Sequence, residues 1–463
     1  MKRIVSLIAL TGLLLGVVQA QDKAGGISVD MLKTLRTSYQ PSAAEKAIQN
    51  AVSNIGIGQL AATADKNIDT YFSNRVISKG ISDQKSSGRC WMFTGFNVLR
   101  AKMISKYNLG AFQFSHNYLF FYDQLEKANL FLELMIANRD KVDEDQTITW
   151  LFKNAIGDGG QFTGVSDLLS KYGCVPAEVM PENKNSNNTG AISNLLSLKL
   201  REFGLDIRNN AKQSTEQLRK KKQEMLKEVY RMLVIAFGQP PAEFEYTMRD
   251  AKGKVISTKT YTPQSFYKEY INEELTDNYV MLMNDPTREY YKLYEIEYDR
   301  HVYDGYNWVY INLPMEEIKK IAIASIKDSV MMYYSCDVGK FLNRDNGMLD
   351  IANYDYASLM GVSFNMDKKE RIQTYASGSS HAMTLCAVDL DNNGKPIKWM
   401  VENSWGPSYG YQGHLIMTDE WFREYTFRLV AEKKYISPEI LKVLDQKPIL
   451  LPPWDPMFQS EIN

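Results

Sequence analysis

A cysteine stands where a polar loop runs into a predicted helix, and this setting favours a reactive thiol. Residues 83–89, with Ser86, Ser87 and Gly88 among them, lead directly into an apolar, helix-like stretch that begins at Cys90. Backbone N–H groups are unpaired at a helix start and the dipole is positive there, so a thiolate is stabilised in such places. We therefore predict that Cys90 is a nucleophile. A buried, unreactive cysteine is the alternative.

Acyl transfer by such a thiol also needs hydrogen-bond donors for the developing oxyanion. Gln84 lies in the same loop, six positions before Cys90. Its side-chain amide and the backbone N–H of Cys90 together supply two donors. Taken alone, a glutamine in a turn is only a surface residue.

A cysteine nucleophile needs a base, and the chain has four histidines: His116, His301, His381 and His414. Small residues flank His381, and an apolar, strand-like stretch follows it. The small neighbours leave room for a substrate beside the imidazole, so His381 is the candidate base. We expect the other three histidines to be structural or exposed.

A predicted hairpin brings an asparagine to this histidine. Residues 391–394 read Asp-Asn-Asn-Gly, which is a turn signal, and residues 397–401 read as the returning strand. A turn centred in this stretch places residue 404 opposite His381, within one or two positions. Asn403 lies in that window. Its side chain can accept a hydrogen bond from one imidazole nitrogen and hold the other towards the thiol.

The residues after Asn403 fit the same role. Trp405 is expected to shield the hydrogen bond between His381 and Asn403 from water, and Gly406 to relieve the backbone. Cys90, His381 and Asn403 then provide a nucleophile, a base and an orienting group.

Length and composition exclude several classes of protein. The 463 residues contain 54 basic and 55 acidic side chains, and a net charge of −1 argues against a nucleic-acid partner. Hydrophobic residues make up 44%, enough for real cores, while 28 glycines and 15 prolines indicate neither a fibrous nor a disordered chain. This length allows two or three domains.

The first twenty residues have the pattern of a secretory signal peptide. Lys2 and Arg3 precede apolar residues 4–18, and a small residue, Ala20, closes the stretch. We predict cleavage after Ala20 and export to the periplasm or the outside of the cell, with no membrane attachment afterwards. A membrane anchor is the alternative, although the stretch is short for a bilayer span.

An oxidising compartment disfavours free thiols that have no use, so the state of the other cysteines matters. Cys174, Cys336 and Cys386 are expected to be buried thiols. A disulfide between two of them is the alternative, and the sequence does not choose the pair.

Periodicity and turn signals divide the rest of the chain. Helices are predicted over residues 43–52, 90–106, 115–134 and 214–238, a loop over 181–190, and strands over 309–313 and 383–390. The helix at Ser214 begins with a capping box completed by Gln217. Its basic cluster, residues 219–222, is expected to be a solvated face, with a nucleic-acid patch as the alternative.

The candidate residues occur in segments that resemble the papain-like cysteine peptidases of the bleomycin hydrolase and aminopeptidase C family. The loop Ser-Ser-Gly-Arg-Cys-Trp and the segment Val-Glu-Asn-Ser-Trp-Gly stand at residues 86–91 and 401–406. Further similar segments are spread over most of the chain, at residues 118–121, 158–161, 171–173, 179–182, 337–340 and 454–457.

The resemblance implies an α+β, two-lobed papain-like fold with a large helical insertion. The expected parts are a signal peptide (1–20), an N-terminal segment (21–75), a helical lobe with Cys90 (76–193), the helical insertion (194–308), a β-rich lobe with His381 and Asn403 (309–450), and a tail that enters the cleft (451–463). The resemblance also implies a homohexamer with inward-facing active sites, and neither a metal nor another cofactor.

The function implied is that of an exported aminopeptidase that acts on peptides. In the family the C-terminal carboxylate, here that of Asn463, holds the free amine of the substrate. Gly159 and Gly160 are further candidate substrate-binding residues, because glycines let a peptide pair with the backbone. Trp405 is a third candidate.

Two alternatives stay open at this point. Residues 458–463 form a longer and more polar ending than the small residues usual in the family, so an endopeptidase with an altered tail is the first alternative. A non-catalytic, exported peptide-binding relative is the second.

Overall fold

The computed structural model describes residues 25–63 and 68–457. The chain divides into two compact units, residues 1–62 and 63–463. The predicted signal peptide lies outside the described residues.

The first unit consists of short helices: α1 (Val29–Ser38), α2 (Ala43–Val52) and α3 (Ile57–Ala61). Ser28 caps α1 by accepting a hydrogen bond from the N–H of Met31. At α2, Ser42 and Glu45 form a capping box, in which each side chain accepts a hydrogen bond from the backbone N–H of the other. The helix predicted over residues 43–52 is confirmed.

The second unit holds the remaining helices and all of the described strands. The helices are α4 (Cys90–Tyr107), α5 (His116–Ala137), α6 (Gln146–Lys153), α7 (Phe162–Tyr172), α8 (Gly190–Asn209), α9 (Thr215–Phe237), α10 (Pro263–Tyr270), α11 (Leu275–Asn278), α12 (Met315–Lys327), α13 (Tyr356–Met360), α14 (Lys368–Gln373), α15 (Asp419–Tyr425) and α16 (Pro438–Leu441).

The strands belong to two sheets. They are β1 (Asn74–Arg75), β2 (Phe244–Arg249), β3 (Val255–Tyr261), β4 (Tyr279–Met283), β5 (Lys292–Ile296), β6 (Val309–Asn312), β7 (Met332–Cys336), β8 (Leu342–Asn343), β9 (Met348–Leu349), β10 (His381–Leu390), β11 (Pro396–Glu402), β12 (His414–Thr418), β13 (Thr426–Glu432) and β14 (Ile449–Leu451). The main sheet has the order β14-β5-β6-β4-β13-β7-β10-β11-β12-β9-β8, with β1 paired to β10, and β2 with β3 forms a separate hairpin.

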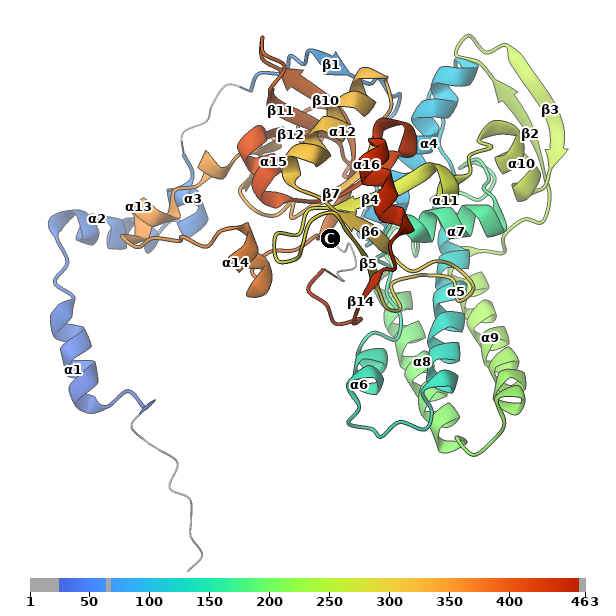
Figure 1. Cartoon of the computed structure of the whole chain (residues 1–463), viewed down its shortest axis with the longest axis horizontal. Coiled ribbons are helices and arrows are strands. Elements are labelled where there is room, and N and C mark those ends of the chain that lie inside the picture. Colours follow the sequence, from blue (N-terminus) through green and yellow to red (C-terminus); the bar gives the residue numbers. More distant parts are fainter. Residues whose placement is uncertain (1–24, 64–67, 458–463) are drawn as a thin grey trace, which may run out of the picture. The chain divides into compact units, whose positions relative to one another are not determined.

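Helix α4 is the central helix of this unit. Its first twelve residues, 90–101, are all buried, and it packs against β10 and β7 on one side and against α7 on another (Figure 1). Arg100 of α4 and Glu402 of β11 form an ion pair and are 2% and 0% exposed. A buried ion pair is strongly destabilised when one partner is lost, so this contact fastens the helix to the hairpin.

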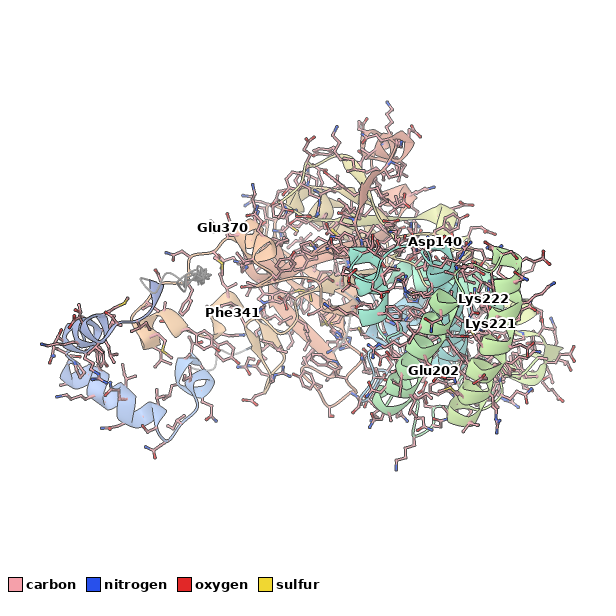
Figure 2. The ribbon with its side chains drawn as sticks, turned by 90° about the horizontal axis from the view of Figure 1, so that it is seen from below. Asp140, Glu202, Lys221, Lys222, Phe341 and Glu370 are labelled. Carbon is pink, nitrogen blue, oxygen red and sulfur yellow. The ribbon has the colours of Figure 1, made fainter. Side chains whose placement is uncertain are left out.

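The long helices α5, α8 and α9 pack beside one another (Figure 1). The basic cluster of α9 lies on this bundle: Arg219 and Lys222 pair with Glu133 of α5, and Lys221 pairs with Asp206 of α8. Figure 2 shows Lys221 and Lys222 on α9 next to α8. These charges are matched by acidic side chains of the neighbouring helices, which favours the helix-face interpretation over a nucleic-acid patch.

The predicted register of the hairpin of β10 and β11 is off by one or two residues. The prediction sets residue 401 opposite Thr384, whereas the structure pairs Thr384 with Glu402. Leu390 pairs with Pro396, so the connection between the two strands is longer than a two-residue turn. Its centre therefore lies later in the chain than the prediction placed it. The error stays within the margin of one or two positions.

The main sheet crosses two of the predicted domain boundaries. β1 lies in the predicted N-terminal segment, yet it pairs with β10. β4 and β5 lie in the predicted helical insertion, yet they pair with β13 and β6 of the main sheet. The description of residues 194–308 as helical is therefore corrected. Short apolar runs such as β4, which is buried on both faces, do not show the alternation that marks a strand in sequence.

Candidate active site

Cys90 is the first residue of α4, as predicted, and its side chain is fully buried. Among the described residues no side-chain hydrogen bond caps this helix, and the N–H groups of Met92 and Phe93 donate to the carbonyl of Arg89. The positive end of the helix dipole favours a thiolate at Cys90. Because α4 packs against β10, the helix that begins with Cys90 lies on the strand that begins with His381.

The structure brings His381 and Asn403 together. Nε2 of His381 lies 2.8 Å from Oδ1 of Asn403, and the backbone N–H of Ser404 donates to the same oxygen at 2.8 Å. A backbone N–H is only a donor, so this contact supports Oδ1 as the carbonyl oxygen of the amide. Nε2 of His381 then carries its proton, and Nδ1 is the nitrogen that can accept one. Nδ1 is buried and has no hydrogen-bond partner within the described chain.

The surroundings of His381 keep its imidazole neutral. Its side chain is fully buried, and the indole of Trp405 stacks on it with ring centroids 4.9 Å apart. Burial lowers the pKa of His381 to about 4, although the hydrogen bond with Asn403 opposes this shift. A neutral imidazole at neutral pH is the form that can take a proton from a thiol. Trp405 covers the histidine, as predicted.

Both the oxygen and the nitrogen of the Gln84 side-chain amide are hydrogen-bonded. Its Oε1 accepts a hydrogen bond from Oγ of Ser404 (2.5 Å), and its Nε2 donates to the carbonyl of Ser87 (2.5 Å). An amide NH₂ group has two hydrogens, so one remains for an oxyanion. The backbone N–H of Gln84 also donates to the carbonyl of Ser404 (2.8 Å). The oxyanion loop and the asparagine segment are thus bonded directly to each other.

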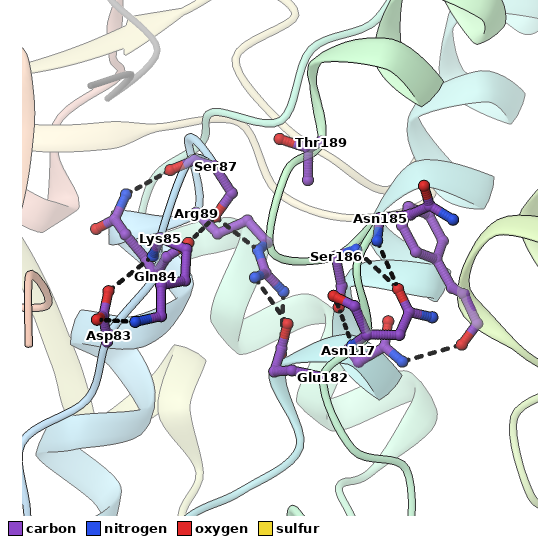
Figure 3. A network of polar contacts seen from close by, with 12 residues as sticks. Asp83, Gln84, Lys85, Ser87, Arg89, Asn117, Glu182, Asn185, Ser186 and Thr189 are labelled. Carbon is purple, nitrogen blue, oxygen red and sulfur yellow. Dashed lines mark hydrogen bonds and ion pairs between the residues drawn. The ribbon is translucent and has the colours of Figure 1, made fainter.

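A buried arginine braces the same loop (Figure 3). Arg89, the residue before Cys90, donates two hydrogen bonds to the carboxylate of Glu182 at 3.1 and 2.9 Å. Its Nε donates to Oγ of Ser87 (3.0 Å), and that hydroxyl donates to the carbonyl of Gln84 (2.6 Å). The backbone at both ends of the loop is therefore held through one side chain.

Gly406 follows the asparagine segment with φ +85°, a left-handed conformation that favours glycine. A Cβ at this position would lie 2.9 Å from a carboxylate oxygen of Asp83. The N–H of Gly406 donates to the carbonyl of Ser82 (3.1 Å). Glycine therefore lets this strand end approach the loop that precedes Cys90.

Gly159 and Gly160 lie in a loop that contacts both sides of the nucleophile. The carbonyl of Asp158 accepts a hydrogen bond from Nε1 of Trp91 (2.9 Å), and its carboxylate accepts one from the N–H of Gly88 (2.7 Å). Trp91 and Gly88 stand on either side of Arg89 and Cys90. The two glycines thus lie next to the predicted nucleophile, as a substrate-binding loop requires.

Comparison with known proteins identifies the family. The model of the Peptidase C1-like family matches residues 26–458. Aminopeptidase C of Streptococcus thermophilus is 36% identical over 93% of this chain and 98% of its own length. Human bleomycin hydrolase is 38% identical over 82% of this chain and 86% of its own length. The chain belongs to the Peptidase C1-like family. It is a cysteine peptidase.

A solved structure agrees with this assignment. PepW from Lactobacillus rhamnosis is 35% identical and superposes with a TM-score of 0.91 over 94% of this chain and 99% of its own. The predicted α+β, papain-like fold and the predicted family are therefore confirmed.

The last described residues of this peptidase, 455–457, are bonded to the β-rich part. Arg288 forms an ion pair with Asp455, and Nη2 of Arg428 donates to the carbonyl of Met457 (2.7 Å), whose side chain is fully buried. Asn463, the predicted amine-binding residue, lies outside the described residues.

The sheet register relates this anchor to His381. His381 of β10 and Thr426 of β13 both pair with Cys336 of β7, so these two strands lie on either side of β7. Two strand spacings amount to roughly 10 Å. Arg428, two residues after Thr426, therefore holds Met457 near the end of the sheet at which His381 begins β10.

The other histidines of the peptidase are buried, so none of the described histidines is exposed. His116 stacks on Phe93 with centroids 3.6 Å apart, and Nδ1 of His414 lies 3.0 Å from the carbonyl of Gln412. His301 lies 2.6 Å from Asp123. The expectation of a structural role fits these contacts, whereas the alternative of an exposed side chain is wrong.

The remaining cysteines form no disulfide in the described structure. Burial raises the pKa of the thiols of Cys174 and Cys386. Cys336 is buried in β7. The prediction of buried thiols is confirmed for all three.

Within residues 25–63 and 68–457, no three or more His, Cys, Asp or Glu side chains are grouped so that they could hold a metal ion. In the same ranges no helix has the length and apolar character needed to cross a membrane.

Sequence reasoning missed three supporting groups of the site. Ser404 was seen only as part of a similar segment, and Arg89 only as a neighbour of the cysteine. The pairing of His301 with Asp123 had no sequence signal at all, because the two residues are far apart in the chain.

Proposed function

We propose that the protein is an exported aminopeptidase that cleaves peptides through Cys90, His381 and Asn403, with Gln84 as an oxyanion donor. The observation that carries this proposal is the hydrogen bond of 2.8 Å between Nε2 of His381 and Oδ1 of Asn403. It leaves Nδ1 as the basic nitrogen at the start of the strand against which the helix of Cys90 packs. The relatives named aminopeptidase C support an action on free N-termini.

The reaction follows from these positions. Nδ1 of His381 takes the thiol proton, and Sγ of Cys90 attacks the scissile carbonyl carbon. The resulting oxyanion accepts hydrogen bonds from the backbone N–H of Cys90 and the second Nε2 hydrogen of Gln84. The imidazolium then gives its proton to the leaving amine, and a water molecule hydrolyses the thioester by the reverse sequence of proton transfers. Asn403 accepts from Nε2–H throughout and keeps the ring oriented.

The restriction to free N-termini is assigned to the tail. Arg288 and Arg428 anchor residues 455 and 457 near the end of the sheet that carries His381. The six residues after Met457 are long enough to reach the cleft, since an extended chain spans about 3.3–3.6 Å per residue. We assign the Asn463 carboxylate to the substrate's ammonium group, because a charge pair screened from water is stronger than an exposed one.

The test compares the mature enzyme with a variant that ends at Met457. Each is assayed on matched pairs of peptides with a free or an acetylated N-terminus. The truncated variant should lose rate on free-amine peptides and gain activity on acetylated ones, while Cys90 stays reactive to alkylation. A matched variant with two glycines added after Asn463 keeps every side chain but moves the carboxylate, and it should lose the preference as well.

Two outcomes would contradict parts of the proposal. An unchanged preference in both variants would mean that the tail does not set it. Equal cleavage of free and acetylated peptides by the mature enzyme itself would make an endopeptidase the better description. Peptide cleavage that survives Cys90→Ala would exclude Cys90 as the nucleophile.

Export and assembly form separate parts of the proposal. The pattern of residues 1–20 supports cleavage after Ala20, and N-terminal sequencing of protein recovered outside the cytoplasm should begin at Gln21. The resemblance to the bleomycin hydrolase group supports a homohexamer. Light scattering of the mature protein should then give six times the mass of one chain, and the mass of a single chain would contradict it.

A further inference from the structure

A buried charged cluster lies beside the candidate site but takes no part in the proposed chemistry. His301 and Asp123 are 3% and 0% exposed, and Nδ1 of His301 lies 2.6 Å from Oδ1 of Asp123. Lys127, one helical turn after Asp123 on α5, lies 2.9 Å from the other carboxylate oxygen. Burying ionisable groups such as His301 and Asp123 is costly unless each is paired, so such a cluster needs a structural or functional reason.

Lys127 and His301 of this cluster contact the loop of Gly159 and Gly160. Nζ of Lys127 donates to the carbonyls of Gly159 (2.6 Å) and Gly157 (3.1 Å). A Cβ at residue 160 would overlap the imidazole carbon Cε1 of His301 and lie 2.8 Å from Cε2 of Trp91. The imidazole therefore packs directly on the backbone of Gly160, and only a glycine admits it there.

The ring of His301 has room to move on one side. His301, Lys127, Gly159 and Gly160 line a cavity of about 230 Å³, whose other walls are apolar side chains of α5 and α6 and residues of the segments 153–157 and 298–300. His301 also touches the indole of Trp91 edge-on, with centroids 4.6 Å apart. The hydrogen bond with Asp123 holds the ring under the loop, where the ring also packs on the backbone of Gly164.

The opposite side of the loop faces the nucleophile segment. Asp158 is bonded to the N–H of Gly88 and to Nε1 of Trp91, which fixes the loop next to Cys90. The N–H and the carbonyl of Gly160 make no hydrogen bond to any of the described residues. Such a pair of backbone groups beside a nucleophile can pair with the backbone of an extended peptide.

We propose that His301, held by Asp123, is a positioning residue that sets the backbone of Gly160 for pairing with the peptide substrate. This inference rests on the proposed function, and it goes beyond it by assigning substrate affinity to a cluster on the far side of the loop. His301 does not touch the reacting atoms. It acts through the backbone of Gly160.

The first experiment uses His301→Ala and Asp123→Asn in the full chain. Loss of one well-placed backbone hydrogen bond to the substrate should raise KM about tenfold, with kcat within about twofold of the wild type. Asp123→Asn, which keeps a hydrogen-bonding group but removes the charge, should raise KM less. His116→Ala removes another buried imidazole, away from the loop, and its KM should stay within about twofold of the wild type.

A second readout separates this inference from the proposed function. Iodoacetamide alkylates Cys90 without using the peptide-binding loop, so its rate should be the same in the wild type, His301→Ala and Asp123→Asn. A wild type that is not inactivated by labelling of Cys90 would refute the proposed function itself. Slower alkylation in His301→Ala, together with a lower kcat and an unchanged KM, would instead place the cluster in support of the nucleophile and overturn the inference.

The steric contact supplies the sharpest test. Gly160→Ala alone should raise KM strongly, because the new Cβ overlaps the imidazole. In the His301→Ala background the ring is absent and the contact with Trp91 at 2.8 Å remains, so Gly160→Ala should then add less than it does alone. Fully additive effects of the two substitutions would show that the ring does not act on the loop.

Discussion

Ser404 and Gln84 are bonded to each other twice, side chain to side chain at 2.5 Å and backbone to backbone at 2.8 Å. Through its own N–H, Ser404 also donates to the Oδ1 of Asn403 that lies 2.8 Å from the imidazole. One serine therefore holds the proposed oxyanion donor and the proposed orienting group in one geometry.

The first prediction concerns Gln84. Gln84→Ala should lower kcat by roughly 10²–10³, because it removes a preorganised oxyanion donor. Gln84→Glu should be similarly impaired, since a carboxylate still accepts from Ser404 but cannot donate. Steady-state kinetics on one peptide measures both, with the exposed Gln223→Ala as a control that should match the wild type. A Gln84→Glu variant of normal kcat would remove Gln84 from the oxyanion site.

Asn403 should matter less than His381. Asn403→Ala removes the group that orients the imidazole, whereas His381→Ala removes the base that carries the proton. We expect both to lower kcat and the loss to be larger for His381→Ala. Parallel measurement of kcat for the two variants checks this order. A greater loss in Asn403→Ala would mean that the two roles are assigned wrongly.

Cys90 should react before the other thiols. Burial raises the pKa of Cys174 and Cys386, and neither stands at the start of a helix. Brief treatment with iodoacetamide followed by peptide mapping should find the label on Cys90, in step with the loss of activity. Cys90→Ser should abolish turnover and leave the thermal unfolding curve nearly unchanged. Equal labelling of Cys174 would count against the assignment.

Acid should destabilise the fold through His381. Burial lowers the pKa of this histidine from 6.5 to about 4, so below pH 6.5 the unfolded chain binds a proton that the native chain does not. Native stability therefore falls as the pH drops from 6.5 towards 4 and is not changed by this group above that range. The contribution of this one group amounts to roughly 3 kcal/mol.

The measurement uses urea unfolding at pH 8 and pH 4.5. The Cys90→Ala background removes any thiolate that would favour the imidazolium. Comparing Cys90→Ala with Cys90→Ala/His381→Gln isolates the histidine, and the double variant should lose less stability at the lower pH. The same loss in both would show that His381 does not carry this dependence.

Much of the candidate site could be predicted from local patterns. The polar loop before an apolar helix predicts the position of Cys90, and the start of α4 at this residue confirms it. The turn at residues 391–394 predicts that Asn403 lies within two positions of the residue opposite His381 in the hairpin. The hydrogen bond between the two side chains agrees with this prediction. Capping boxes and hairpin turns depend on neighbours within a few residues, which a sequence displays directly.

The tertiary structure alone decided which distant residues support these groups. Ser404 meets Gln84, Asp123 meets His301, and β4 and β5 join the main sheet, and no local pattern indicated any of these contacts. Each joins segments that are far apart in the chain and that approach only when α4 is buried against β10 and β7. The sequence by itself determined the kinds of side chain and their local backbone, whereas packing of the whole unit decided their partners, because burial acts on every element at once.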